Sequence, residues 1–178
     1  KRASAAEITV VMPYMAYGRQ DRKAKGREPI SAAAMIRVLQ SAGADRLVSV
    51  DMHSAQTQGV FNGPFDHLTA EPALVEALRD EITDEASEDV VVVSPDAGRV
   101  KEAEEYADAL GAVSLHIPKT RRDDELERRH GIETLDGKVA IITDDMIDTA
   151  GTLISAVEVV KTAGARRILV AATHGILS

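Results

Sequence analysis

The sequence lacks cysteine and tryptophan entirely, and aromatic residues make up only 3% of its 178 residues. The absence of cysteine excludes disulfides and thiolate chemistry, and it fits a cytoplasmic protein. No apolar run is long enough to span a bilayer, and the chain shows no signal peptide. Hydrophobic residues still make up 44% of the chain, so we expect a soluble cytoplasmic protein whose core consists mostly of Val, Ile, Leu and Ala.

Positive charge is also scarce in this chain. Lys and Arg number 21 against 29 Asp and Glu, which gives a net charge of −8. This balance argues against nucleic acid or an anionic membrane as the main partner, because both require a positive potential. The Walker GxxxxGK-Ser/Thr motif, HExxH and GxSxG are all absent. A P-loop nucleotidase, a zinc protease and an α/β-hydrolase are therefore disfavoured.

Short apolar runs alternate with helical patterns along the chain. The predicted strands are 8–12, 47–50, 90–93, 113–117, 139–143 and 168–172. The predicted helices are 31–42, with Ser31 as its N-cap and Gly43 at its end, then 71–82, 99–110 and 153–163. Strands that alternate with helices of this length are typical of parallel sheets. The pattern predicts an α/β fold with parallel sheets flanked by helices.

A polar stretch with Gly and Pro separates two halves of this pattern. We place a domain boundary there, between an N-terminal domain at 1–67 and a C-terminal domain at 68–178. The alternative is that Gly and Pro mark one long loop. The first residue is Lys1 rather than Met, so we expect a fragment whose N-terminal domain is incomplete at its start.

The segment 144–152 lies between a predicted strand and a predicted helix. The helix start favours an anion such as phosphate, Gly151 lets the backbone approach it closely, and Thr149 and Thr152 add hydroxyl donors. Asp144 and Asp145 can accept hydrogen bonds from sugar hydroxyls. The segment therefore suits ribose 5-phosphate. The alternative is that acidic residues near a helix start only stabilise the helix.

Acidic residues also follow two other predicted strands. Asp51 and His53 follow one, and Asp96 follows another. Ligands of open α/β sheets bind at such strand ends, where these side chains can hold a phosphate-bound magnesium ion. The alternative for His53 is an ordinary histidine without a metal. The basic segments 19–27 and 119–129 are either solvated surfaces or the groups that stabilise phosphoryl oxygens.

Several sequence blocks together resemble the ribose-phosphate pyrophosphokinase family. They occur in the family's order at 13–14, 19–23, 29–31, 43–45, 51–61, 70–72, 94–98, 119–121, 144–152 and 173–175. The resemblance implies two phosphoribosyltransferase-like α/β domains. It also implies transfer of the pyrophosphoryl group of ATP to the anomeric hydroxyl of ribose 5-phosphate, which gives phosphoribosyl pyrophosphate and AMP for nucleotide biosynthesis. Mg²⁺ is the implied cofactor, and a dimer-based homo-oligomer, up to a hexamer, is the implied assembly.

The resemblance also implies roles for individual residues. Arg19, Gln20 and His53 would contact ATP, and His53 with Asp96 would hold the magnesium. Catalysis would fall to Lys119 and Arg121, on a charged and mobile segment (118–133) that closes over the transferring group. The ribose 5-phosphate site would consist of Asp144, Asp145, Asp148, Thr149, Ala150, Gly151 and Thr152.

Some residues depart from the family pattern. Arg99 stands where many relatives have a small residue, next to the turn at Asp96. Ala150 stands where some relatives have Gly, which is tolerable if its φ is negative. An early ATP-contacting segment, which a neighbouring subunit supplies in the family, is missing, so the isolated chain is expected to bind substrates without turnover.

Two other functions remain open. A type I phosphoribosyltransferase would share the 144–152 segment, but it would need a base-binding hood that the sequence does not show. A non-catalytic regulatory relative, or a truncated form that binds ribose phosphates, would also keep this segment. Lys119 and Arg121 argue weakly against the regulatory relative.

Overall fold

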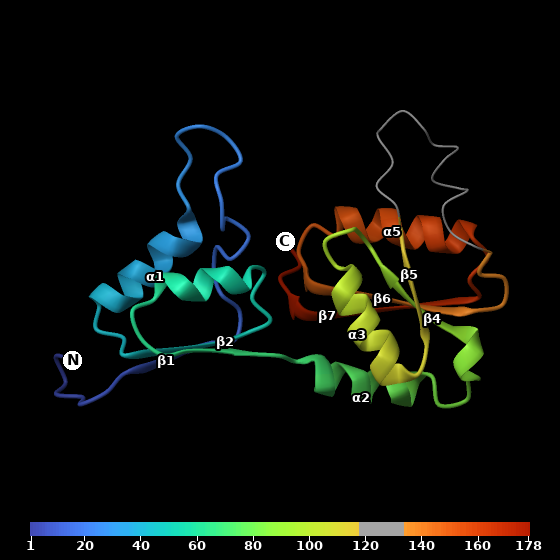
Figure 1. Cartoon of the computed structure of the whole chain (residues 1–178), viewed down its shortest axis with the longest axis horizontal. Helices are drawn as coiled ribbons and strands as arrows, with labels where there is room; N and C mark the ends of the chain where they lie inside the picture. The colour runs from blue at the N-terminus through green and yellow to red at the C-terminus, as the bar shows by residue number, and fades with distance from the viewer. Residues whose placement is uncertain (118–133) are drawn as a thin grey trace. The chain divides into compact units, whose positions relative to one another are not determined.

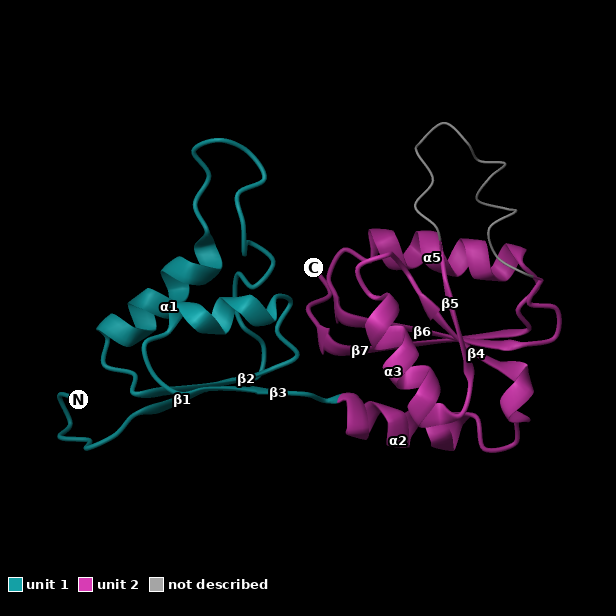
Figure 2. Ribbon diagram, in the orientation of Figure 1, with its two compact units in different colours: residues 1–70 teal, residues 71–178 magenta. Residues whose placement is uncertain are grey.

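The computed structural model describes residues 1–117 and 134–178. It contains two compact units, Lys1–Ala70 and Glu71–Ser178 (Figure 2). A boundary after residue 67, as expected from the sequence, would cut strand β3 (Phe65–Leu68), so the first unit continues to Ala70. Each unit contains a parallel sheet, so the predicted α/β fold with parallel sheets flanked by helices is confirmed. Within the described part of the chain, no helix is both long and apolar enough to cross a membrane.

The first unit has a three-stranded parallel sheet in the order β1-β2-β3. Its elements are β1 (Thr9–Met12), α1 (Ser31–Ser41), β2 (Arg46–Val50), the 3₁₀ helix η1 (Ala55–Val60) and β3. Helix α1 and η1 cover one face of the sheet (Figure 1). Ile36 of α1, Leu47 of β2 and Phe61 after η1 are buried between them. Strand β3 was not predicted, because its sequence Phe-Asp-His-Leu has no continuous apolar run.

Helix α1 starts and ends in different ways. The predicted N-cap was wrong, because Ser31 is the first helical residue and Ile30 occupies the cap without a side-chain hydrogen bond. The end is as predicted. Gly43 has a φ of +104°, its N–H donates to the carbonyl of Gln40 (3.0 Å), and the N–H of Ala44 donates to the carbonyl of Leu39 (3.1 Å). This glycine-dependent pair of bonds satisfies carbonyls that the helix itself leaves open.

The second unit has a four-stranded parallel sheet in the order β5-β4-β6-β7. Its elements are α2 (Glu71–Glu81), η2 (Ser87–Asp89), β4 (Val90–Ser94), α3 (Val100–Leu110), β5 (Val113–His116), β6 (Val139–Ile147), α5 (Gly151–Thr162) and β7 (Arg167–Gly175). Helices α2 and α3 lie on one face of the sheet, and α5 lies on the other (Figure 1).

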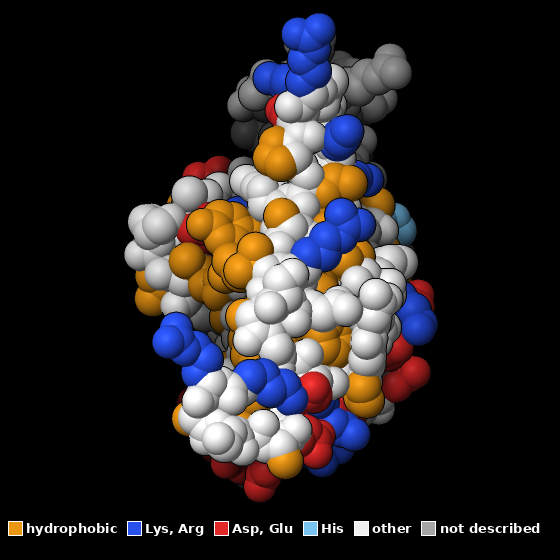
Figure 3. Space-filling model, turned by 90° about the vertical axis from the view of Figure 1, so that its left-hand side faces the viewer, with side chains coloured by type: hydrophobic (Ala, Val, Ile, Leu, Met, Phe, Trp, Pro, Cys, Tyr) orange, Lys and Arg blue, Asp and Glu red, His pale blue; other side chains and the backbone are white. Residues whose placement is uncertain are grey.

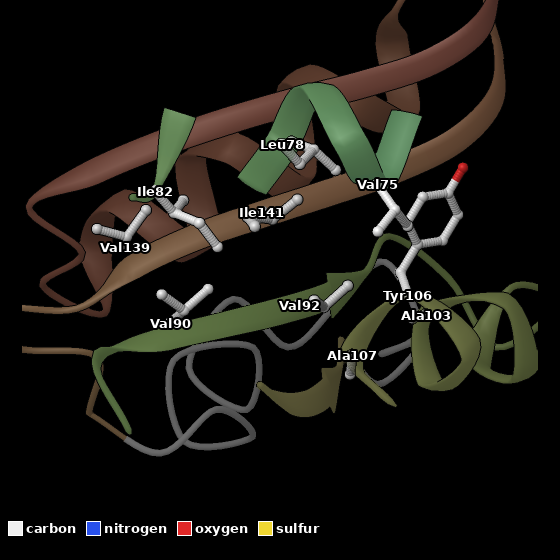
Figure 4. Close-up of a cluster of buried hydrophobic side chains, with 10 residues drawn as sticks. All are labelled: Val75, Leu78, Ile82, Val90, Val92, Ala103, Tyr106, Ala107, Val139 and Ile141. Carbon is white, nitrogen blue, oxygen red and sulfur yellow. The ribbon is translucent and has the colours of Figure 1, made fainter. Parts of the chain in front are cut away.

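The core of the second unit forms on both faces of β4 and β6. Val92 and Ile141 point toward α2 and α3, where they pack with Leu78 and Tyr106 (Figure 4). The alternate residues of the same strands face α5 and pack against Ala156 and Val160. All five residues of β4 are buried, as expected of a parallel strand that is covered on both faces. The continuous apolar runs of the sequence thus correspond to the centre of the sheet.

Strand β6 is longer than predicted. The sequence indicated a strand that ends at Thr143, but β6 continues to Ile147 and includes Asp144 and Asp145. The reason lies in the neighbouring strand, because β7 stays in register beside β6, with Asp144 opposite Ala172 and Met146 opposite His174. Main-chain pairing therefore carries the strand into polar sequence, where the apolar pattern has already ended.

Candidate functional site

The polar side chains of the second unit gather where its strand order reverses. The chain moves outward from β4 to β5 on one side and from β6 to β7 on the other, so the reversal lies between β4 and β6. Ligands of open α/β sheets bind at the carboxyl ends of the strands at this point. Asp96 follows β4, and Asp144 lies two residues beyond Ile142, the last residue of β6 that pairs with β4.

Arg99 joins these two strand ends. Its Nη2 lies 2.6 Å from Oδ1 of Asp145, and its Nε lies 3.6 Å from Oδ1 of Asp144. Nη1 of Arg99 lies 2.6 and 2.7 Å from the two carboxylate oxygens of Glu102. The Arg99 side chain is only 14% exposed, and that of Asp145 only 5%. The guanidinium is therefore a mostly buried cation between one carboxylate of α3 and two of β6.

The ionisation of this cluster follows from burial and from its close charges. Burial raises the pKa of Asp144 to about 6, and the hydrogen bond and negative charge of Asp145 act in the same direction. The positive charge of Arg99 opposes this increase. Burial by itself would lower the pKa of Arg99, but Glu102 and Asp145 together raise it above its ordinary value. Arg99 therefore stays charged, and the pKa of Asp144 lies well above that of an ordinary aspartate.

Asp96 organises the turn between β4 and α3. Its Oδ1 accepts the N–H of Gly98 (2.7 Å), and its carbonyl accepts the hydroxyl of Ser94 (2.5 Å) and the N–H of Arg99 (3.2 Å). No group of three or more His, Asp or Glu side chains forms a metal cage within residues 1–117 and 134–178. Magnesium does not require one, because it binds through one or two carboxylates together with substrate phosphates and water. A half-buried carboxylate such as that of Asp96 fits this chemistry.

The expected phosphate-binding residues surround the start of α5. Ala150 is the N-cap of this helix, and no side chain caps it. The first N–H groups of a helix have no partner within the helix, and together with its dipole they attract an anion. Thr149, Gly151 and Thr152 are exposed, and Asp148 accepts a hydrogen bond from the hydroxyl of Ser178. The segment therefore has the form that phosphate binding requires.

Ala150 does not have the negative φ that would make alanine tolerable at this position. The structure places Ala150 at φ 58° and ψ 11°, in the left-handed region. In that region the Cβ lies too close to the following carbonyl oxygen, which costs about 1–2 kcal/mol. The turn between β6 and α5 is therefore strained.

Ala150→Gly is expected to stabilise the protein by roughly 0.5–1 kcal/mol. Glycine removes the left-handed strain, and its larger loss of freedom on folding offsets part of the gain. Urea unfolding measures the difference. Ala77→Gly is the matched control, because Ala77 lies exposed within α2, where the same change should cost about 1 kcal/mol. Destabilisation by both changes would contradict the strain at Ala150.

The predicted ATP contacts of the first unit lie close together. Arg19 and Gln20 are exposed in the loop between β1 and α1, and the carbonyl of Gln20 accepts the N–H of Ala32 (3.3 Å). Gly18 lies beside the exposed His53, since a Cβ added to Gly18 would be 3.9 Å from the Cβ of His53. The structure thus places Gly18, the residue directly before Arg19 and Gln20, beside His53.

The loop after β2 is held by its own polar side chains. Asp51 has a φ of +39°, and its Oδ2 accepts the N–H of Ala70 (3.0 Å). The N–H of Met52 donates to Nε2 of His67 (2.8 Å). The hydrogen bond of Asp51 gives this residue a structural role within the first unit. Its expected contribution to a magnesium site stays a prediction.

The basic loop before α1 presents its charges to solvent. Arg22, Lys23, Lys25 and Arg27 are exposed, and Lys and Arg side chains project from this region of the surface (Figure 3). The N–H groups of Ala24 and Lys25 donate to Oε2 of Glu28 (3.1 and 2.9 Å), which holds the loop in a turn. The exposed charges fit both readings of this segment, a solvated surface and a phosphate contact.

Two other predictions are not tested by the described residues. His53 belongs to the first unit and Asp96 to the second, and each unit is described by itself, so their shared magnesium site stays a prediction. Lys119 and Arg121, with the charged segment 118–133, lie outside the described residues.

Sequence reasoning did not predict the role of Arg99. It singled out Arg99 only as an unusual residue beside the Asp96 turn. The carboxylates that it contacts, Asp144 and Asp145, lie far away in the sequence, and no periodic pattern connects them. The one usable signal was the position of Arg99, a cation shortly after the end of one strand, in a chain where another strand ends in two aspartates.

Known proteins resemble this chain along its whole length. Residues 1–43 match the family model for the N-terminal domain of ribose phosphate pyrophosphokinase, and residues 130–178 match that for the phosphoribosyl synthetase-associated domain. Ribose-phosphate pyrophosphokinases from Corynebacterium efficiens and Bifidobacterium longum are each 48% identical to it over 100% of the chain. The chain covers 55% and 53% of these two relatives, about half of their length.

A solved structure shows the same fold. The crystal structure of phosphoribosylpyrophosphate synthetase from Mycobacterium smegmatis matches 99% of the chain with a TM-score of 0.88 at 48% sequence identity, and the chain covers 57% of that protein. Fold and site thus define an α/β protein with a candidate ligand site at the reversal point of its second sheet. The chain belongs to the ribose-phosphate pyrophosphokinase family.

Proposed function

We propose that the protein transfers the pyrophosphoryl group of ATP to the anomeric hydroxyl of ribose 5-phosphate, which gives phosphoribosyl pyrophosphate and AMP. The observation that carries this proposal is the arrangement at the end of β6. There two carboxylates, held by Arg99, lie a few residues before the uncapped start of α5. Carboxylates accept hydrogen bonds from the ribose hydroxyls, and the helix start binds the 5-phosphate. The names of the relatives support the same reaction.

The two units would hold the two substrates. Asp144 and Asp145 accept the ribose hydroxyls, and Asp148, Thr149, Ala150, Gly151 and Thr152 surround the phosphate. Arg19, Gln20 and His53 of the first unit contact ATP. The anomeric oxygen then attacks the β-phosphorus of ATP, the bond between that phosphorus and the oxygen of the α-phosphate breaks, and AMP leaves. Positioning and charge neutralisation carry most of the catalysis in such transfers.

Magnesium and a partner subunit belong to the proposal as well. Asp96, together with His53, would hold a magnesium ion, which neutralises phosphate charge when it is bound. Lys119 and Arg121 would stabilise the transferring group. Family resemblance favours a dimer-based homo-oligomer in which a neighbouring subunit completes the ATP site.

The nucleotide product tests this proposal directly. The full-length protein is incubated with ATP, magnesium and ribose 5-phosphate, and the nucleotides are separated. AMP that forms only in the presence of ribose 5-phosphate supports pyrophosphoryl transfer. ADP would identify an ordinary kinase and contradict the proposal. Absence of turnover, together with binding of phosphoribosyl pyrophosphate, would favour a regulatory relative.

The raised pKa of Asp144 predicts a pH dependence of ribose 5-phosphate binding. Ribose hydroxyls donate to the ionised carboxylate, so affinity should rise as the pH increases through about 6 and level off above it. The phosphate of the ligand titrates in the same range, with a second pKa of about 6. Binding to Asp144→Asn is therefore measured in parallel by calorimetry between about pH 5 and about pH 8, a range that includes the titration of both groups. The variant should keep only the phosphate step, and an unchanged profile would contradict ligand contact by Asp144.

A further inference from the structure

The three carboxylates around Arg99 are held unequally. Asp145 lies in a short contact of 2.6 Å with Nη2 of Arg99, whereas Asp144 lies at the longer distance of 3.6 Å from Nε. The Asp145 side chain is 5% exposed and that of Asp144 is 20% exposed. Asp145 is thus fixed by the guanidinium, while Asp144 keeps more freedom and more access to solvent.

The orientation of Arg99 is itself fixed from two directions. Glu102 accepts from Nη1 with both carboxylate oxygens, at 2.6 and 2.7 Å, so the planar guanidinium cannot turn without breaking these bonds. The N–H of Arg99 donates to the carbonyl of Asp96, whose carboxylate also accepts the N–H of Gly98. One residue therefore connects the Asp96 turn, through its main chain, to the end of β6, through its side chain.

We propose that Arg99 is a positioning residue, which fixes Asp145 and so sets the geometry in which Asp144, the more exposed of the two carboxylates, accepts ribose hydroxyls. This inference rests on the proposed function. Two adjacent carboxylates without a cation repel each other and leave the hydroxyl-binding geometry undefined. With Arg99 present, Asp145 is held against the guanidinium, while Asp144, whose Oδ1 accepts the N–H of Asp145 (2.8 Å), keeps the larger exposed fraction.

The competing interpretation is that Arg99 only stabilises the fold. Removing one partner of a buried ion pair destabilises a protein because it leaves uncompensated charge. In that case substitution of Arg99 would lower the affinity for every ligand of the second unit by the same factor, since all of these ligands need the folded site. A positioning role affects mainly the sugar end, because the side chain of Arg99 contacts Asp144 and Asp145 there. Ribose 5-phosphate and inorganic phosphate are therefore the two probes that separate the interpretations.

The experiment compares Arg99→Gln, Arg99→Lys and Lys101→Gln with the unchanged protein by calorimetric titration. Arg99→Gln is expected to weaken ribose 5-phosphate binding by about 10- to 100-fold, the loss typical of a charged hydrogen-bond partner. Binding of inorganic phosphate should change by less than about twofold if its site stays intact. Lys101 lies on the same helix with an 88% exposed side chain, so Lys101→Gln should leave both affinities unchanged.

Arg99→Lys shows whether geometry as well as charge is needed. Lysine keeps the cation but cannot bridge carboxylates as a planar fork, so ribose 5-phosphate affinity should fall by roughly three- to tenfold, an intermediate loss. This variant also keeps the inference testable if Arg99→Gln does not fold. Unchanged ribose 5-phosphate affinity in both Arg99 variants, or equal losses for both probes, would overturn the positioning role. Failure of the unchanged protein to bind ribose 5-phosphate would instead overturn the proposed function, and this inference with it.

Discussion

Replacing Lys119 with Ala is expected to lower the rate of pyrophosphoryl transfer by about 10²- to 10³-fold, the usual effect of removing one group that stabilises charge in the transition state. The affinity for ribose 5-phosphate should stay the same. The transferring phosphoryl group carries its charge on oxygens that bind neither to the ribose carboxylates nor to the 5-phosphate site. A cation that acts on them contributes to turnover and not to ground-state binding of the sugar phosphate.

Two measurements on each variant check this expectation. AMP formation gives the rate of the protein under saturating substrates, and titration with ribose 5-phosphate gives its affinity. Lys101→Ala is the matched control, because it removes the same cation from an exposed position on α3. The Nζ of Lys101 lies 3.4 Å from Glu105, on the same helix. The control should change neither value. An equal loss of rate and affinity in Lys119→Ala would show that the residue binds the ground state.

Ile141→Ala should reduce the free energy of unfolding by about 3–4 kcal/mol, because a fully buried isoleucine leaves a cavity when it is truncated. Ile141 is 0% exposed in the first half of β6, in the cluster that joins the sheet to α2 and α3 (Figure 4). Most domains are stable by only about 5–15 kcal/mol, so this single change removes a large share of that margin. Urea unfolding followed by circular dichroism measures it.

Ile154→Ala provides the same substitution at an exposed position. Ile154 is 55% exposed on α5, so its truncation should alter the free energy of unfolding by no more than about 0.5 kcal/mol. Similar losses at both positions would contradict the assignment of Ile141 to the core. Because the substitution is the same in both variants, any difference between their losses of stability reports the burial of the side chain.

The parts of the fold with continuous apolar sequence were predictable. Val90–Ser94 of β4 and the first half of β6 are buried on both faces, and that burial is what an unbroken run of Val, Ile and Ala indicates. The end of α1 was predictable for a local reason as well, because Gly43 supplies the positive φ that ends the helix. Such features depend on neighbouring residues in the sequence, so the sequence alone carries them.

The features of the fold that the sequence did not predict depend on contacts between distant residues. Strand β3 and the second half of β6 exist because a neighbouring strand offers hydrogen-bond partners, and their own side chains give no apolar pattern. The positive φ of Ala150 and the ion pairs of Arg99 depend in the same way on how α5 and α3 leave the sheet. For the candidate site, the segment 144–152 was singled out from its residues, whereas the ion pairs of Arg99 with Asp144 and Asp145 were not predicted.

Strand β6 also determines how the site behaves when the second unit opens transiently. Residues 139–142 are paired with β4 on one side and with β7 on the other, whereas beyond Ile142 the strand continues beside β7, and most of its nine residues are buried. In native-state amide exchange, such central strands exchange at or near the free energy of global opening, whereas peripheral helices and turns exchange through smaller fluctuations. The half of β6 that carries Asp144 and Asp145 should therefore open more readily than residues 139–142, and the turn at Ala150 should fluctuate first. We expect the two carboxylates of the candidate site to stay in place through local openings that move the start of α5.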